Sequence, residues 1–226
     1  MIRKITFIFI STLFVSFLPI VSLSAQHRTP IQQPSDTLPV FRGVAIGLDL
    51  LGVGQRWLSS YGQYEAQARL NLKDRYFPVV EVGLGQADAQ DETTNLNYQT
   101  SAPYARIGVD FNILKNKHDL YRFYIGARLA YTSFAFDLSS QDITDPVWGG
   151  NVSYQAIDQK CNMFWAELSA GVDATIWKWI HMGWSVRYRS RLHQSITDVG
   201  EPWYVPGYGR NASSRLGATF NLIFEI

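Results

Sequence analysis

The 226-residue sequence predicts an all-β fold: an eight-stranded antiparallel up-and-down transmembrane β-barrel with short turns on one rim and long loops on the other. Three observations predict it. Apolar and polar residues alternate with a period of two in eight segments. After the first 25 residues, no apolar run approaches the roughly twenty residues of a transmembrane helix. Short and long connections alternate between the segments, as they do in barrels that span a membrane.

The first segment predicts export. Two basic residues, Arg3 and Lys4, precede an uncharged run at residues 5–21, and small residues follow as far as Ala25. This order predicts a signal peptide at residues 1–25, cleaved after Ser24 or Ala25. A transmembrane anchor is the alternative, and the short run followed by small residues favours the cleaved signal. No cysteine follows the cleavage site, which argues against a lipid anchor.

The remaining chain predicts one domain. Residues 26–40 carry three prolines among polar residues and predict an extended lead-in, so residues 41–226 form the barrel. A single cysteine, Cys161, excludes an internal disulfide and a Cys-based zinc site. The net charge of +1, without a basic block, argues against a nucleic-acid partner. No two histidines have the spacing of a metal site, so we expect no metal and no cofactor.

The predicted strands follow from the parity of their apolar positions. In the first three, apolar side chains take the even positions; in the next two they take the odd positions; in the last three they return to the even ones. The predicted strands are residues 43–50, 64–72, 77–85, 103–113, 123–134, 164–176, 182–192 and 215–226.

The connections predict which rim faces which way. Short turns are expected at residues 73–75, 115–119 and 178–181, and long loops at residues 52–63, 86–102, 137–163 and 193–213. In outer-membrane barrels the short turns are periplasmic and the long loops are extracellular. We therefore expect the same arrangement here.

The last predicted strand is long enough to cross a bilayer, since a tilted membrane strand needs about 9 to 11 residues. Its order of Arg215, Gly217, Phe220 and Leu222 resembles the C-terminal signal by which the assembly machinery recognises outer-membrane barrels. It departs from the commonest form of that signal because the chain ends in Ile226 and not in an aromatic residue. The resemblance implies that the assembly machinery is a partner of this chain.

Alternation leaves open which face of the strands points inward. A soluble lipocalin-like periplasmic carrier would have the apolar face inside. A membrane barrel would have the charges inside, because a charge that faces lipid at the midplane costs about 2 to 4 kcal/mol. The apolar faces carry almost no charge, which favours the membrane barrel.

Charges inside so narrow a barrel must be paired. The hairpins predict four pairs: Arg191 with Glu167, Arg187 with Asp173, Asp110 with Arg128, and Arg69 with Glu81. We interpret the set as a structural plug of salt bridges and not as a proton or ion path, and a water-filled pore needs more strands. The predicted luminal network is Asp49, Glu65, Arg69, Glu81, Arg106, Asp110, Arg128, Glu167, Asp173, Arg187, Arg189, Arg191 and Arg215.

One short motif suggests catalysis. His193-Gln194-Ser195 resembles the His-x-Ser of outer-membrane lipid A deacylases of the PagL kind, which implies a base and a nucleophile. Parity places both side chains on the luminal face, whereas a deacylase must reach lipid outside the barrel. Asp198 and Glu201 are candidates to orient the histidine. We therefore predict that the protein is not an enzyme.

Aromatic residues gather in the expected loops. They could anchor a partner, pack a cap over the barrel mouth, or lie among lipopolysaccharide sugars, and the sequence leaves these alternatives open. The predicted loop aromatics are Trp57, Trp148, Trp203, Tyr204 and Tyr208.

Taken whole, the predicted barrel resembles small outer-membrane barrels of the OmpA-transmembrane, OmpX and OmpW kind, and is similar to uncharacterised single-domain barrels of Bacteroidota. The resemblance implies the outer membrane of a Gram-negative bacterium, with lipid and lipopolysaccharide around the wall. We expect a structural or interaction protein with a closed lumen that acts through its extracellular loops. The alternatives are a narrow conduit for small or apolar solutes, a lipid-modifying enzyme, and the soluble carrier.

Overall fold

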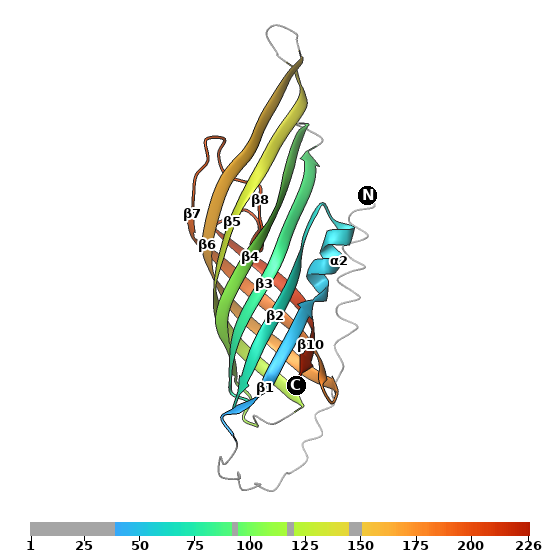
Figure 1. The fold of residues 1–226 in the computed structure, drawn as a ribbon, viewed down its shortest axis with the longest axis vertical. Coiled ribbons are helices and arrows are strands. Elements are labelled where there is room, and N and C mark those ends of the chain that lie inside the picture. The colour runs from blue at the N-terminus through green and yellow to red at the C-terminus, as the bar shows by residue number, and fades with distance from the viewer. Residues whose placement is uncertain (1–38, 92–94, 117–119, 145–150) are drawn as a thin grey trace. The chain divides into compact units, whose positions relative to one another are not determined.

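The computed structural model describes residues 39–91, 95–116, 120–144 and 151–226 (Figure 1). The predicted signal peptide and nearly all of the lead-in lie outside these ranges. In the described residues, eight strands close into a barrel in the order β1-β10-β7-β6-β5-β4-β3-β2. The all-β, eight-stranded antiparallel up-and-down barrel is confirmed. Its strands are β1 (Phe41–Asp49), β2 (Tyr61–Leu72), β3 (Tyr76–Asp91), β4 (Leu96–Asn112), β5 (Tyr121–Thr144), β6 (Asn151–Trp177), β7 (Ile180–Gln194) and β10 (Ser214–Glu225).

Short turns join β2 to β3 and β6 to β7 at one end of the barrel, which we call the turn end; the opposite end is the loop end. In the first of these turns, Lys73 and Asp74 adopt the left-handed backbone conformation that tight hairpins require. Asn71 fixes this turn, because its side chain accepts from Asp74 N (2.9 Å) and donates to Asp74 Oδ1 (2.7 Å). A polar turn sequence therefore sets the register of two neighbouring strands.

Several strands are longer at the loop end than predicted. Strands β3 and β4 pair as far as Asp91 and Leu96, and β5 and β6 as far as Thr144 and Asn151. Most of the expected loops at residues 86–102 and 137–163 is therefore strand. Toward the loop end the inner face becomes apolar, with Ala87, Tyr98 and Phe136 buried, and the outer face becomes polar. The apolar residues therefore change parity along each strand, and the continuous alternation that marks a strand in the sequence is lost. The β5–β6 hairpin extends beyond the other strands (Figure 1).

A helix, α2 (Leu50–Leu58), lies in the connection between β1 and β2 that was predicted to be a loop. It begins where it does because the Asp49 carboxylate accepts from Leu51 N (3.1 Å) and caps the first turn. The helix contacts both β2 and β10. Among the described residues, no helix combines the length and the apolarity needed to cross a membrane.

The two faces of the barrel wall are opposite in character. Large apolar side chains point outward, and Ile107 and Leu168 are 64% and 60% exposed. The charged residues of the alternate positions point inward, and Glu81 and Asp110 are fully buried. The lipocalin-like alternative, which needs the apolar face inside, is therefore wrong.

The interior has two layers. Charged side chains fill the middle of the barrel, and a buried aromatic and apolar cluster lies above them toward the loop end. The connection from β7 to β10 supplies part of that cluster and contains a small hairpin, β8 (Tyr204–Val205) paired with β9 (Gly209–Arg210). The last connection thus folds inward over the charged layer.

Candidate functional site

The centre of the interior is the Glu81 carboxylate on β3. Three guanidinium groups from three other strands surround it. The distances are 2.7 Å from Arg187 Nη1 to Oε2, 2.8 Å from Arg128 Nε to Oε1, and 3.1 Å from Arg106 Nη1 to Oε2. Hydrogen bonds from several guanidinium groups replace much of the hydration that the carboxylate loses on burial.

Two more carboxylates lie beside this centre. Glu65 on β2 pairs with Arg106 and with Arg187 (3.1 Å), and it also accepts from Tyr104 Oη (2.7 Å). Glu167 on β6 lies 3.0 Å from Arg106 Nε and 3.3 Å from Arg189 Nε, and it accepts from Trp165 Nε1 (2.7 Å). Neutral donors thus supplement the ion pairs.

A second group of pairs lies toward the turn end. Arg69 on β2 reaches across the barrel to Asp173 on β6 (2.6 Å) and also lies 3.4 Å from Asp110 on β4. Arg128 lies 2.9 Å from Asp110 and so links this group to Glu81. In the middle of the barrel, five guanidinium groups face five carboxylates: Arg69, Arg106, Arg128, Arg187 and Arg189 against Glu65, Glu81, Asp110, Glu167 and Asp173. We call this set the luminal network.

The observed pairs differ in part from the four that strand adjacency predicts. Asp110 does pair with Arg128. Glu167 pairs with Arg189 instead of Arg191, because the two stand opposite each other in the β6–β7 register. The other two predictions were wrong, since Arg69 pairs with Asp173 and Asp110, and Arg187 with Glu81 and Glu65. These side chains reach strands that are not their neighbours.

Three predicted members lie outside the luminal network. Asp49 is buried, caps α2 and accepts from Phe220 N (3.2 Å). Arg191 lies at the loop end and pairs with Glu201 (3.1 Å). Arg215 donates to the Arg210 main-chain oxygen (3.1 Å). The predicted assembly residues Arg215, Gly217, Phe220 and Leu222 all lie on β10.

The β7–β10 connection binds directly to the luminal network. The main-chain oxygens of Gly207 and Tyr208 accept from Arg106 Nη2 (2.6 Å) and Arg189 Nη1 (2.7 Å). The Tyr208 ring packs edge-on against Trp165, with 5.7 Å between ring centroids. Cationic side chains below thus hold the backbone of this loop over the network.

Tyr204 fixes the same loop from the other side. Its hydroxyl donates to Gly62 O (3.1 Å), and its main-chain oxygen accepts from Tyr98 Oη (2.6 Å). Burial raises the pKa of Tyr204 to about 12, so the hydroxyl remains protonated and able to donate well into the alkaline range. Trp203 packs beside it against Tyr61, at 5.8 Å between centroids. Three of the predicted loop aromatics therefore pack in a cap.

The other two loop aromatics have different surroundings. Trp57 on α2 is 82% exposed, and Trp148 lies outside the described residues.

A cluster of charged and polar side chains at the turn end was not predicted from the sequence. Glu225 near the end of β10 lies 2.7 Å from Arg122 and 3.2 Å from His181 Nε2, and it accepts from Asn71 Nδ2 (2.7 Å). Glu225 takes an odd position, the inward parity of its strand, and that parity could have identified it.

The structure does not form the catalytic pair suggested by His193 and Ser195. An irregularity in β7 places His193 opposite Phe164, on the outer face, so the predicted luminal position of His193 was wrong. Ser195 Oγ accepts from Asn162 N (2.8 Å) and donates toward Cys161 Sγ (3.5 Å), and its described hydrogen bonds do not include His193. Of the candidates to orient the histidine, Glu201 binds Arg191 and Asp198 is exposed.

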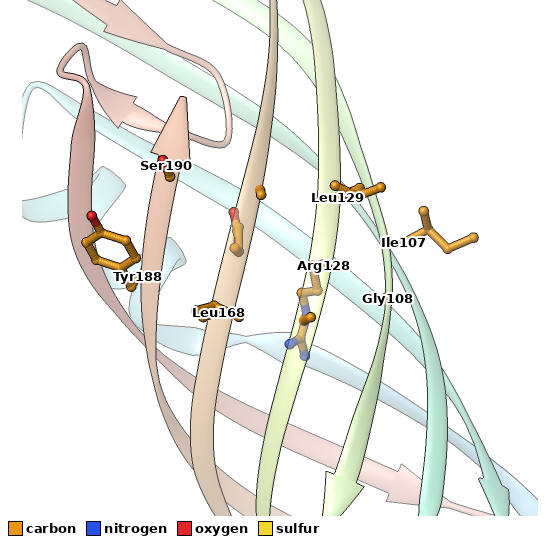
Figure 2. Close-up of a pocket in the computed structure, with 10 residues that line it drawn as sticks. Ile107, Gly108, Arg128, Leu129, Leu168, Tyr188 and Ser190 are labelled. Atoms are coloured by element: carbon orange, nitrogen blue, oxygen red, sulfur yellow. The ribbon is translucent and has the colours of Figure 1, made fainter. Parts of the chain in front are cut away.

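The outer wall carries a shallow apolar hollow (Figure 2). Ile107, Leu129, Leu168 and Tyr188 project around it, and small outward residues such as Ser190 form part of its floor. Among the described residues, no group of three or more His, Cys, Asp or Glu side chains is placed to hold a metal ion.

Comparison with known proteins gives a family and several distant likenesses. The model of a family described as Domain of unknown function (DUF6048) matches residues 5–225. No curated protein matches the chain. The chain is similar to the N-terminal β-barrel domain of Pseudomonas aeruginosa OprF, with 13% identity, 82% of this chain and 100% of that chain covered, and a TM-score of 0.40.

Two further solved structures resemble it to a similar degree. Neisserial surface protein A (NspA) shares 13% identity, with 83% and 98% of the two chains covered and a TM-score of 0.42. A major outer membrane protein from Thermus thermophilus shares 12% identity, with 81% and 98% covered and a TM-score of 0.42. Likenesses this distant transfer no role to the chain.

Proposed function

The chain belongs to the DUF6048 family, a domain of unknown function, and from its own side chains we propose that it is an integral outer-membrane β-barrel protein. In this proposal its lumen is closed by salt bridges, and it acts as a structural or interaction protein through the surface at its loop end. The surrounding partners are membrane lipid and lipopolysaccharide, and the outer-membrane assembly machinery inserts the barrel. These assignments extend the resemblance to small outer-membrane barrels.

The apolar outer wall carries the proposal. Outward residues on neighbouring strands, such as Leu84, Ile107, Leu129 and Leu168, are each about half exposed or more. Monomeric soluble proteins rarely expose contiguous apolar patches larger than a few hundred Å². Lipid hydrocarbon around the wall would keep these apolar side chains out of contact with water, which supports a membrane position.

The charged interior supports a closed lumen. An eight-stranded barrel has room inside for little more than its own side chains. Here the luminal network crosses that space from β2 to β6, and the main chain of the β7–β10 connection lies over it. The conduit alternative would require these buried ion pairs to separate, which is costly. The enzyme alternative loses its support because His193 and Ser195 do not face each other.

The β5–β6 hairpin supports a role in interactions. Strand β6 pairs with β7 only from Met163 onward, so residues 153–161 have a strand partner on the β5 side alone. A free strand edge can accept an extended segment of another protein. Asp158, with a left-handed backbone, and the exposed Lys160 interrupt this edge, and such features protect an edge from unselective pairing.

A gel and surface-labelling experiment tests the membrane position. We would place an epitope tag at residues 145–150 and run the outer-membrane fraction on a denaturing gel with and without boiling. The expected result is a mobility shift on boiling, together with labelling of the tag in intact cells. A tag placed in the 73–75 turn is the matched control and should stay unlabelled. Release into the soluble periplasmic fraction without a mobility shift would contradict the proposal.

A second experiment tests the interaction role. A photo-crosslinking residue at Lys160, on the free edge of β6, should give one discrete adduct in intact cells. The same residue at Asp88, on the paired β3–β4 hairpin, is the control and should not give that adduct. Identical adduct patterns from the two positions would argue against the hairpin edge as the binding surface.

A further inference from the structure

The barrel wall is incomplete between β1 and β10. These strands pair where residues 44–49 face residues 221–226, whereas on its other side β10 pairs with β7 up to Ser214. The chain leaves the sheet at Asp49 to form α2. Toward the loop end, β10 therefore has no strand on its β1 side.

The free edge of β10 can be followed residue by residue. Val44 and Ile226 exchange both main-chain hydrogen bonds, so by alternation the even residues of β10 direct their main-chain groups toward β1. The next even residue beyond the paired segment is Phe220, and its N–H donates to the Asp49 side chain (3.2 Å). Ala218 and Leu216 come after it, where no strand remains to pair with them.

Helix α2 contacts both strands that flank this gap but fills it unevenly. It packs closely on β2: a Cβ at Gly62 would lie 2.5 Å from Arg56 Cα, and a Cβ at Gly52 would lie 2.8 Å from Gln63 O. At Gly54, which faces β10 residues across a hollow, a Cβ would meet nothing within 4 Å. A hollow, which we call the side opening, therefore lies between α2 and β10.

The side opening changes character along its length. Toward the outer wall, it is lined by exposed apolar side chains that include Leu50, Trp184 and Leu216. Toward the interior and the loop end, it is lined by Arg189 and Arg215. It is thus apolar where it meets the outside of the barrel and cationic at its inner, upper end.

The two arginines are placed differently. Arg189 reaches the opening past Gly217, where a Cβ would lie 3.3 Å from its guanidinium group, and it also contacts Glu167 (3.3 Å). Arg215 donates to a neutral acceptor, the Arg210 oxygen, and the salt bridges of the described residues do not include it. Its charge is therefore available to an anionic ligand.

One carboxylate also lines the opening, at its opposite end. Asp49 pairs in the sheet with Asn221. Arg215 lies six residues before Asn221 on the same strand, so Asp49 and Arg215 are roughly 20 Å apart along the strand. The Asp49 carboxylate already accepts from Leu51 N and Phe220 N. It therefore does not oppose an anion at the arginine end.

We propose that the side opening binds an acyl-chain amphiphile with an anionic phosphate head group, drawn from the surrounding membrane. The head group lies at Arg215 and Arg189, and the acyl chain leaves between α2 and β10 along the apolar wall. The arginines lie toward the loop end and the apolar lining faces outward, which matches a lipid of the outer leaflet with its head group at the membrane surface. The inference rests on the proposed position in the outer membrane.

A photolabelling experiment tests the site. The full chain would be inserted into nanodiscs of phosphatidylcholine that contain a small fraction of phosphatidic acid with a diazirine on its acyl chain. After illumination, peptides carrying the label would be identified by mass spectrometry. The expected label concentrates on α2 and on residues 216–220, compared with the strands on the opposite wall.

Two variants and a control sharpen the result. Gly54→Leu fills the opening, because nothing lies near its Cβ, and should remove most of the label from these peptides. Trp57→Leu alters an exposed residue of the same helix that does not line the opening, and should leave the label unchanged. Arg215→Gln should reduce the preference for phosphatidic acid over a phosphatidylcholine probe of equal chain length by about tenfold, as for the loss of one charge-assisted hydrogen bond.

The outcomes separate this inference from the proposed function. Heat-dependent gel mobility of each variant reports insertion, and failure of the wild-type chain to insert would overturn both. Insertion with label spread evenly around the wall, or with label unaffected by Gly54→Leu, would overturn the site alone. Equal labelling of wild type by the two probes would overturn the assignment of an anionic head group.

Discussion

Glu81 in the middle of the barrel and Glu201 at the loop end each accept from an arginine of β7, and otherwise their surroundings differ. Glu81 is fully buried and shares three guanidinium groups. The Glu201 side chain is 60% exposed and lies 3.1 Å from Arg191, which is itself partly exposed. Exposed ion pairs contribute about 0 to 1 kcal/mol, whereas breaking a buried pair costs about 3 to 5 kcal/mol. The same contact therefore has a different energetic meaning in the two places.

The comparison also shows what a buried ionic layer contributes to a barrel of this kind. Replacing such a layer with well-packed apolar residues is often neutral or stabilising, so the network is weak support for stability as such. It does distinguish the two faces of each strand. A slip of β3 by one residue would move Glu81 to the outer wall and leave its three arginine partners inside without it. The network thus favours one register and one choice of inner face.

The largest effect is expected at the centre. Glu81→Ala leaves Arg106, Arg128 and Arg187 with one carboxylate fewer in a buried site, and should lower the free energy of unfolding by about 3 to 5 kcal/mol. Urea unfolding in lipid vesicles, followed by the folded band on a gel, would measure it. A loss below about 1 kcal/mol, the range of exposed pairs, would remove the difference between centre and rim.

A double-mutant cycle in the lower part of the network sharpens the comparison. Asp173→Asn leaves Arg69 with Asp110 alone, and Arg69→Met leaves Asp173 without its cation. The double variant should be less destabilised than the sum of the two single variants by about 1 to 3 kcal/mol, as for residues in one network. The same vesicle unfolding measures all three proteins. Additive losses would mean that the pair does not act as a unit.

The cap should show an intermediate effect that depends on pH. Tyr204→Phe removes the hydrogen bond to Gly62 O and should cost about 1 kcal/mol at neutral pH. Burial raises the pKa of Tyr204 from 10.0 to about 12 in the folded state, so its protonated form stabilises the fold below pH 10. That stability is lost as the pH rises from 10 to 12. Unfolding curves of wild type should fall more steeply over this range than those of the phenylalanine variant.

The smallest effect is expected at the rim. Glu201→Gln removes the exposed partner of Arg191, and the free energy of unfolding should change by less than about 0.5 kcal/mol. Added salt should reduce this small difference from wild type further, because salt screens exposed ion pairs. A loss as large as that of Glu81→Ala would show that exposure does not set the value of these pairs.

Much of the fold could be predicted because every strand through the middle of the barrel has one apolar and one polar face. The prediction fell short where that contrast disappears. In the hairpin ends around Asp88 and Gln99 the outer face is polar and the inner face carries Ala87 and Tyr98, so the apolar parity of the strand middle is reversed and the pattern breaks in the sequence. Helix α2 carries a capping Asp49, but Gly52 and Gly54 weaken its helical pattern.

The site was predictable as a set of residues and less so as a set of pairs. Parity alone places Glu65, Glu81 and Glu167 inside. Which arginine each one meets depends on distances across the barrel, and strand adjacency carries no information about these. The irregularity near Leu192 also reversed the parity of His193, and no sequence pattern marks it.

The short contact between β1 and β10 has a kinetic consequence. Ala45 and Glu225 pair although 180 residues separate them, so this contact has a far larger loop-closure entropy than any hairpin in the chain. Folding slows as contacts become less local, and we expect closure of this seam to be the rate-limiting step of folding. Before closure, the sheet would expose two unpaired edges to aggregation, and a catalyst that joins these edges would accelerate folding.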